Sequence, residues 1–298
     1  MALKCLGLVL LYTGVVQGEL LGWWDSGFIT SCLLGSGILL LIFIIRASFY
    51  KKSFGYLNWI RNYNLRICFL IACLYGFLML PNTLFVPSFL GLVAGLKAYQ
   101  IGDVSNIAFV VYLLFSPVAI IMARRLEPRL VMIIGITIIG IACLIGHQIN
   151  YQWRTEEFIL LMVLQAIGEC IMLIGLIASF VTNIKPHEAL HLGAYISIAR
   201  VLMPALAGAL MNTYLRISYD THKNILREYI QTGDQKLMDN SLESVQYVVS
   251  LVARESHVAS FIDGFSAIYL FVILGMVCMS FLKSSPENPI VPTLVKSH

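Results

Sequence analysis

The chain has 298 residues, of which 59% are hydrophobic and 12% are charged, and its formal net charge is +4. Soluble domains carry roughly 25% charged residues, so this composition and a mean hydropathy of +0.83 exclude an ordinary water-soluble protein. The sequence contains no basic cluster interleaved with aromatic residues, which argues against nucleic-acid binding. A polytopic membrane protein is therefore predicted.

Spanning helices are predicted from runs of about 20 mainly apolar residues, the length that crosses a bilayer. The expected spans lie at about 4–18, 26–46, 66–90, 104–123, 130–149, 157–180, 191–215 and 260–282. The first is the shortest and weakest of them. The predicted fold class is all-α, with about eight transmembrane helices.

Two polar connections separate groups of these spans. Residues 48–66 mix basic and aromatic side chains, which is typical of a segment at the lipid headgroup level. Residues 216–259 form a long polar loop, in which two short amphipathic helices are predicted. Asp220 is expected to cap the first helix and Gly233 to end it, and Asn240 is expected to begin the second.

The lysines and arginines predict the orientation, because cationic loops resist translocation. With the N-terminus inside, the short outer loops carry only Lys97 and Arg154. Both termini are then expected in the cytoplasm, and 216–259 outside an inner (plasma) membrane. Residues 4–18 also fit a cleaved signal peptide, since a lysine precedes a short apolar run. Charge bias does not distinguish a leader from a first span.

Five stretches carry a pattern of turn and charged residues that resembles one transporter family. They are GELLGWWDSG with Trp23, Trp24 and Asp25; YLNWIRNYNLR with Leu57 and Arg61; LFVPSFLGLVAGLKAYQIGDV with Pro87, Gly95 and Gly102; GAYISIARVLMPALAGAL with Arg200; and RESHVASFIDGFSAIYL with Asp263. In this order they are similar to the fourteen-helix drug:proton antiporter branch of the major facilitator superfamily, the EmrB/QacA-type multidrug exporters. The GWWDS turn then favours 4–18 as a spanning helix over a leader.

The chain also departs from the family pattern. MARRLEPRLVMIIG keeps Arg129 of the family's loop between the second and third helices of a bundle but lacks its aspartate and glycines. This puts the ion-paired gating of that loop in question. The resemblance begins at the family's seventh helix, so a six-helix N-terminal bundle is expected to be missing.

The resemblance implies two regions, with two extra central helices and a cytoplasmic linker in 1–65. The C-terminal six-helix bundle occupies 66–298 and carries the external loop 216–259. The implied function is proton-coupled efflux of hydrophobic or cationic drugs, with a proton gradient but no metal or other cofactor, and not catalysis. A separate N-terminal half, and a periplasmic adaptor bound by 216–259, are the implied partners. The alternatives are a half-transporter that needs that N-terminal half, or a truncated membrane interaction protein without transport.

Charged groups inside spans are the candidate functional residues, because each costs about 2.5–3.5 kcal/mol at the bilayer centre. Glu169 lies near the middle of its span, with Gln165 one turn away on the same face. Arg200 lies roughly 13 Å into the next span. One hypothesis makes Glu169 a cavity-facing proton carrier tuned by Arg200. The other makes the three side chains a static network that orients two helices.

Three further features carry structural expectations. Asp263 is expected to cap the start of the last span. Pro81 is expected to kink its helix. The glycine pairs Gly91/Gly95 and Gly135/Gly140 are expected to allow close helix packing.

Overall fold

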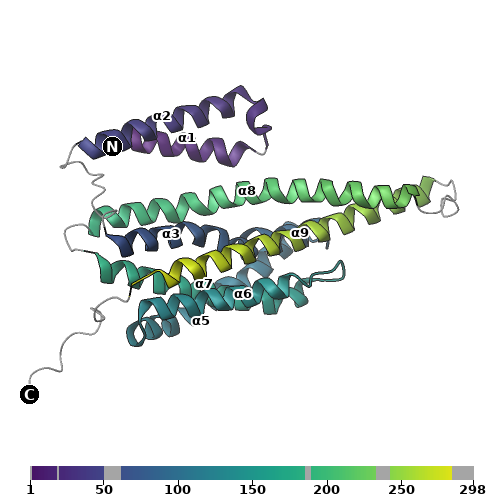
Figure 1. Cartoon of the computed structure of the whole chain (residues 1–298). Helices are drawn as coiled ribbons and strands as arrows, with labels where there is room; N and C mark the ends of the chain where they lie inside the picture. The colour runs from purple at the N-terminus through teal and green to yellow at the C-terminus, as the bar shows by residue number, and fades with distance from the viewer. Residues whose placement is uncertain (1, 19, 50–61, 185–188, 233–241, 284–298) are drawn as a thin grey trace, which may run out of the picture.

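The computed structural model describes residues 2–18, 20–49, 62–184, 189–232 and 242–283 (Figure 1). Its elements are all helical within these ranges. In chain order they are α1 (Ala2–Gly18), the 3₁₀ turn η1 (Trp23–Asp25), α2 (Gly27–Phe49), α3 (Tyr63–Leu78), the π-turn η3 (Pro81–Phe85), α4 (Val86–Leu92), α5 (Ala98–Arg125), α6 (Pro128–Gly146), α7 (Thr155–Asn183), α8 (Ala189–Thr232) and α9 (Leu242–Ser280). Each predicted span falls on one of these helices except 66–90, which α3, η3 and α4 share, and the all-α prediction is confirmed.

Length and composition support a membrane location. Within the described residues, five helical stretches are long and apolar enough to cross a bilayer: Tyr63–Leu92, Ala98–Arg125, Pro128–Gly146, Thr155–Asn183 and Gln246–Ser280. Helices α1 and α2 contain the shorter apolar stretches Cys5–Gly18 and Gly27–Phe43. The prediction of a polytopic helical membrane protein is therefore confirmed.

The bundle is built around the pair α6 and α7. Helix α5 packs on α7, and α9 contacts α3, α6 and α8. At the crossing of α6 and α7, a Cβ atom on Gly135 would lie 2.6 Å from the backbone nitrogen of Met172. A Cβ on Gly140 would lie 3.2 Å from Val272 of α9. The close-packing expectation therefore holds for this glycine pair.

The second glycine pair behaves differently. A Cβ on Gly91 would meet Ile101 at an ordinary 3.5 Å, and one on Gly95 would meet nothing within 4 Å. Gly95 instead has a φ of +67°, in the turn between α4 and α5. Glycine adopts this left-handed conformation without the steric cost that a Cβ imposes.

Pro81 interrupts the third span as predicted. It has no backbone N–H to donate, and the helix widens there into a π-turn in which the Val86 N–H donates to the carbonyl of Pro81. Phe85, at the end of this turn, packs edge-on against Phe265 of α9 with ring centroids 5.0 Å apart. The turn is therefore held against the last helix by a buried aromatic contact.

Helices α8 and α9 are much longer than the spans predicted within them. Helix α8 runs without a break to Thr232, and α9 is already helical at Leu242. In Figure 1 the two helices project side by side past the other helices. The prediction of a loop with two separate short helices is therefore wrong, because both amphipathic segments continue the spans. Gly233 and Asn240 lie outside the described residues.

The first two helices form a hairpin beside this bundle. Helix α1 packs against α2 and also contacts α8 (Figure 1). Gly22, with a φ of +74°, starts the turn that joins them. The predicted interfacial segment that follows α2 falls mostly within 50–61, outside the described residues.

Candidate functional site

Glu169 is the fifteenth of the 29 residues of α7 and is completely buried. Gln165, one turn earlier on the same helix, is equally buried. An isolated charge in this position is costly, so its partners decide what the site can do. The spacing of these two residues predicted that they meet, and they do.

Two side chains hold the Glu169 carboxyl. The amide nitrogen of Gln165 donates to Oε1 at 2.8 Å, and the hydroxyl of Tyr112 on α5 donates to Oε2. A third group, the Tyr75 hydroxyl of α3, donates to the backbone carbonyl of Glu169 at 3.4 Å. The site therefore joins α3, α5 and α7 through one acidic residue.

Gln165 also connects the site to the interrupted third span. The same amide nitrogen donates to the carbonyl of Leu78 at 2.6 Å, three residues before Pro81. Neighbouring side chains commonly supply such donors where proline disturbs a membrane helix. In the π-turn η3, Asn82 is buried and donates to the carbonyl of Met162 on α7 at 3.5 Å. Asn82 of the π-turn thus faces α7, whereas Thr83 is exposed and donates to the carbonyl of Met79.

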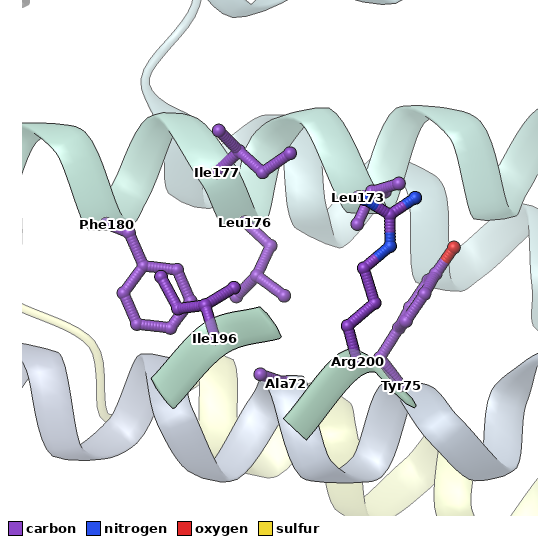
Figure 2. A pocket seen from close by; sticks show the side chains of 8 residues that line it. All are labelled: Ala72, Tyr75, Leu173, Leu176, Ile177, Phe180, Ile196 and Arg200. Carbon is purple, nitrogen blue, oxygen red and sulfur yellow. The ribbon is translucent and has the colours of Figure 1, made fainter. Parts of the chain in front are cut away.

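Arg200 lies apart from the carboxyl. No ion pair joins Arg200 and Glu169, both of which the structure describes, and Arg200 instead interacts electrostatically with Tyr75. Figure 2 shows the two side chains projecting next to each other from α8 and α3 into a pocket. The expected three-residue network therefore divides: Gln165 meets the Glu169 carboxyl, while Arg200 lies beside Tyr75 in the pocket.

The pocket in Figure 2 is small and mostly apolar. It measures about 40 Å³, and besides Tyr75 and Arg200 its lining residues are Ala72, Leu173, Leu176, Ile177, Phe180 and Ile196. A water molecule needs roughly 10–15 Å³ on such a measure, whereas drug-sized ligands occupy about 300–1,000 Å³. In this conformation the pocket can accept water beside Arg200 but not a drug-sized compound.

The family-motif positions near the ends of the helices have structural roles. Trp23, Trp24 and Asp25 form the turn between α1 and α2, where the resemblance expected a loop. Pro87 is the second residue of α4, directly after the π-turn. Gly102 lies near the start of α5, and a Cβ there would meet nothing within 4 Å.

Arg129 holds the end of the last helix. From the first turn of α6, its guanidinium donates to the carbonyls of Ser280 at 3.2 Å and Leu282 at 3.1 Å. These carbonyls lack helical partners, since they close the C-terminal end of α9, where a cation is favourable. The motif arginine is thus engaged inside this bundle.

Asp263 is not a helix cap. It lies inside the continuous helix α9, so the predicted cap is wrong, and Asp220 lies inside α8 in the same way. The Asp263 carboxylate reaches across to α8, where Ser218 donates to Oδ2 at 2.6 Å and the His222 ring nitrogen lies 2.8 Å away. Residues 218 and 222 are one helical turn apart, which lets both meet one carboxylate.

We expect Asp263→Ala to lower the free energy of unfolding by about 1 kcal/mol or less, because the Asp263 side chain is 40% exposed and exposed pairs are weak. Asp220→Ala, on the exposed surface of α8, is the matched control and should be neutral. Thermal unfolding in detergent measures both. Equal melting temperatures for the two variants would show that the contact between α8 and α9 contributes nothing.

Sequence reasoning missed Tyr75 and Tyr112. Both stand in apolar runs, where a tyrosine is readily taken for an interfacial residue. Tyr112, however, is the fifteenth of the 28 residues of α5, far from either end. Since buried tyrosine hydroxyls usually find a partner, a mid-span tyrosine was the available signal.

The helical fold and the buried carboxyl define a polytopic membrane protein with an acidic site inside its bundle. Residues 67–219, just over half of the chain, match the model of the Major Facilitator Superfamily. The chain belongs to this family of membrane transporters. The match runs from α3 to α8 and includes Glu169, Tyr112 and Arg200. None of the curated protein sequences compared with the chain matches it.

Proposed function

We propose that this chain exports hydrophobic, often cationic compounds in exchange for protons, as a member of the fourteen-helix drug:proton antiporter branch. In this proposal Glu169 binds and releases the proton, in an inner (plasma) membrane with both chain termini in the cytoplasm. The branch, the orientation and the substrates rest on the resemblance of the five motif stretches. The role of Glu169 rests on its environment.

The single observation that carries the proposal is a fully buried carboxyl held by neutral donors. Gln165 and Tyr112 are both uncharged donors, and no cation pairs with Glu169 among the described residues. Uncharged donors leave the cost of the buried negative charge largely uncompensated. A proton removes this cost, and the Tyr112 hydroxyl can accept as well as donate, so it suits both protonation states.

We expect Glu169→Gln to lower the rate at which a pH gradient drives the fluorescent cation ethidium across the membrane by about 10-fold or more. The amide keeps the size of the side chain but cannot carry the proton. Proteoliposomes that contain the full chain, with an imposed pH gradient, provide the measurement. Glu156→Gln, at an exposed position in the first turn of the same helix, is the control. Gradient-driven flux at the wild-type rate in Glu169→Gln, or flux absent from the wild type both alone and together with a six-helix N-terminal half, would contradict the proposal.

We also propose that a second bundle completes the substrate path, either a separate N-terminal half or another copy. The pocket beside Arg200, about 40 Å³, is too small for a drug-sized substrate. The larger hollow of about 470 Å³ is lined by exposed side chains such as Leu210 and Leu270, and a half-transporter would have a second bundle to cover such a face. Alternating access in such folds moves one bundle against another around a shared site. Co-expression with a six-helix N-terminal half should then raise ethidium flux. Equal flux with and without that half would count against it.

The projecting parts of α8 and α9 support a proposal about the partner. We propose that they bind a periplasmic adaptor through their exposed apolar side chains, among them Ile225 and Tyr247. A photo-crosslinking residue at 247 should give an adduct with the adaptor in an active tripartite system. The same residue at Phe109, on the exposed face of α5, should give none. Absence of an adduct from 247 would count against docking.

A further inference from the structure

The Glu169 carboxyl can be reached through few groups. Among the described residues, only Gln165 and Tyr112 contact its oxygens, because Tyr75 meets the backbone carbonyl instead. Gln165 is fully buried, and Tyr75 is 4% exposed. Gln165 and Tyr112 are therefore the hydrogen-bonded neighbours through which a proton can pass directly to or from Glu169.

The two contacting groups differ in chemistry. The Gln165 nitrogen only donates and its amide oxygen only accepts, so passing a proton along would require an unfavourable tautomer. That nitrogen is also engaged by the Leu78 carbonyl at 2.6 Å. The Tyr112 hydroxyl donates and accepts through a single oxygen. Of the two groups, the hydroxyl is the one that can pass a proton.

Tyr112 also lies at the edge of the bundle. Its side chain is half-buried, between the buried Val111 and the exposed Leu113. Its hydroxyl end contacts a completely buried carboxyl, while part of the same residue reaches the outer surface of α5. Tyr112 therefore connects the outside of the bundle with Glu169.

We propose that Tyr112 relays protons to and from Glu169, an inference that rests on the proposed function of that carboxyl. On uptake, the Tyr112 O–H bond breaks as a new bond forms between its proton and Oε2. The phenol oxygen takes a proton from a hydronium ion in the substrate path that the proposed second bundle completes, and this leaves a water molecule there. Tyr112 is neutral before and after the step, and Glu169 changes from carboxylate to carboxylic acid. Release runs through the same atoms in reverse.

Other titratable and charged groups surround the site. Tyr75 faces it from α3 and Cys170 from α7 itself, and Arg200 approaches Tyr75 from α8. Neither Tyr75 nor Cys170 hydrogen-bonds the carboxyl oxygens among the described contacts. Tyr99→Phe makes the matched control, because Tyr99 is exposed near the start of the same helix α5 and no described contact joins it to Glu169.

The test is the rate at which Glu169 gains a proton after a rapid drop in pH. The full chain in lipid nanodiscs is followed by time-resolved infrared spectroscopy of the protonated carboxyl band, which is assigned by its loss in Glu169→Gln. We expect the band to rise about 10-fold or more slowly in Tyr112→Phe and at the wild-type rate in Tyr99→Phe. Tyr112→His, which restores a group that exchanges protons, should recover part of the rate. Thermal unfolding checks that each variant is folded.

The outcomes separate the relay from the function of Glu169. A wild-type rate in Tyr112→Phe, or an equally slow rate in Tyr112→His, would overturn the relay while leaving Glu169 as the proton carrier. A change only in the pH midpoint of the band, with the rate intact, would reduce Tyr112 to a hydrogen-bond partner and also overturn the relay. If the wild type shows no band that Glu169→Gln removes, Glu169 does not titrate, and the proposed function fails together with the relay.

Discussion

Gly135→Ala should destabilise the bundle by about 1–3 kcal/mol, and Gly135→Leu by more, because both introduce atoms where α6 meets the backbone of α7. The new Cβ would lie 2.6 Å from the Met172 nitrogen and 2.8 Å from its Cα. Backbone atoms cannot rotate away as a flexible side chain can, so the two helices must separate. This pair is the centre of the bundle, and the effect should extend to the Glu169 site on α7.

The loss is measured as a shift of the unfolding midpoint in a denaturing detergent titration. Gly102→Ala on α5 is the matched control, since its Cβ would meet nothing within 4 Å. Alanine stabilises a helix interior by up to about 1 kcal/mol over glycine, so this control should be neutral or slightly stabilising. Equal midpoints for Gly135→Ala and the wild type would show that the helices do not pack as closely as described.

Gln165→Leu should cost about 2–4 kcal/mol, because it leaves two buried acceptors without their donor. One is the Leu78 carbonyl at 2.6 Å and the other is Oε1 of Glu169 at 2.8 Å. Typical hydrogen bonds between membrane helices contribute only about 0.6 kcal/mol. A larger loss in the free energy of unfolding would therefore reflect the unsatisfied carboxyl of Glu169. The double variant Gln165→Leu with Glu169→Leu removes that carboxyl.

The double variant should therefore be less destabilised than the sum of the two single variants. The four proteins form a double-mutant cycle, measured by the same detergent titration. Additive losses would show that Gln165 and Glu169 contribute independently. A Gln165→Leu protein as stable as the wild type would contradict the hydrogen bonds at this position.

Helices could be predicted from the sequence where patterns among neighbouring residues determine them. Apolar runs located every span, and the four-residue spacing of Gln165 and Glu169 placed them on one face. The polar composition between the last two spans did not indicate how far α8 and α9 extend as helices. Polar side chains do not end a helix, and Asp220 and Asp263 resemble caps in sequence while lying inside continuous helices. Residues that cap a helix at its start are the same types that bind across to a neighbouring helix.

The rest of the site depends on contacts between distant segments. Tyr112 lies 57 residues from Glu169, and Tyr75 lies 94 residues away. Nothing in the local sequence of α5 or α3 indicates that their hydroxyls face the same acidic residue. Arg200 illustrates the converse, because its depth in α8 suggested a pairing with Glu169, whereas the structure places it beside Tyr75 in the pocket. Packing between helices decides these partners, and periodicity along one helix does not.

The most direct test of the central claim is the release of protons when a substrate binds. Purified full chain, alone and together with a six-helix N-terminal half, is mixed with ethidium in lightly buffered detergent solution, and a pH-sensitive dye records the protons that appear. If Glu169 exchanges its proton for the cation, the wild type releases protons on binding and Glu169→Gln binds ethidium without releasing any. Equal release by both proteins, or ethidium binding without release by the wild type, would contradict the account.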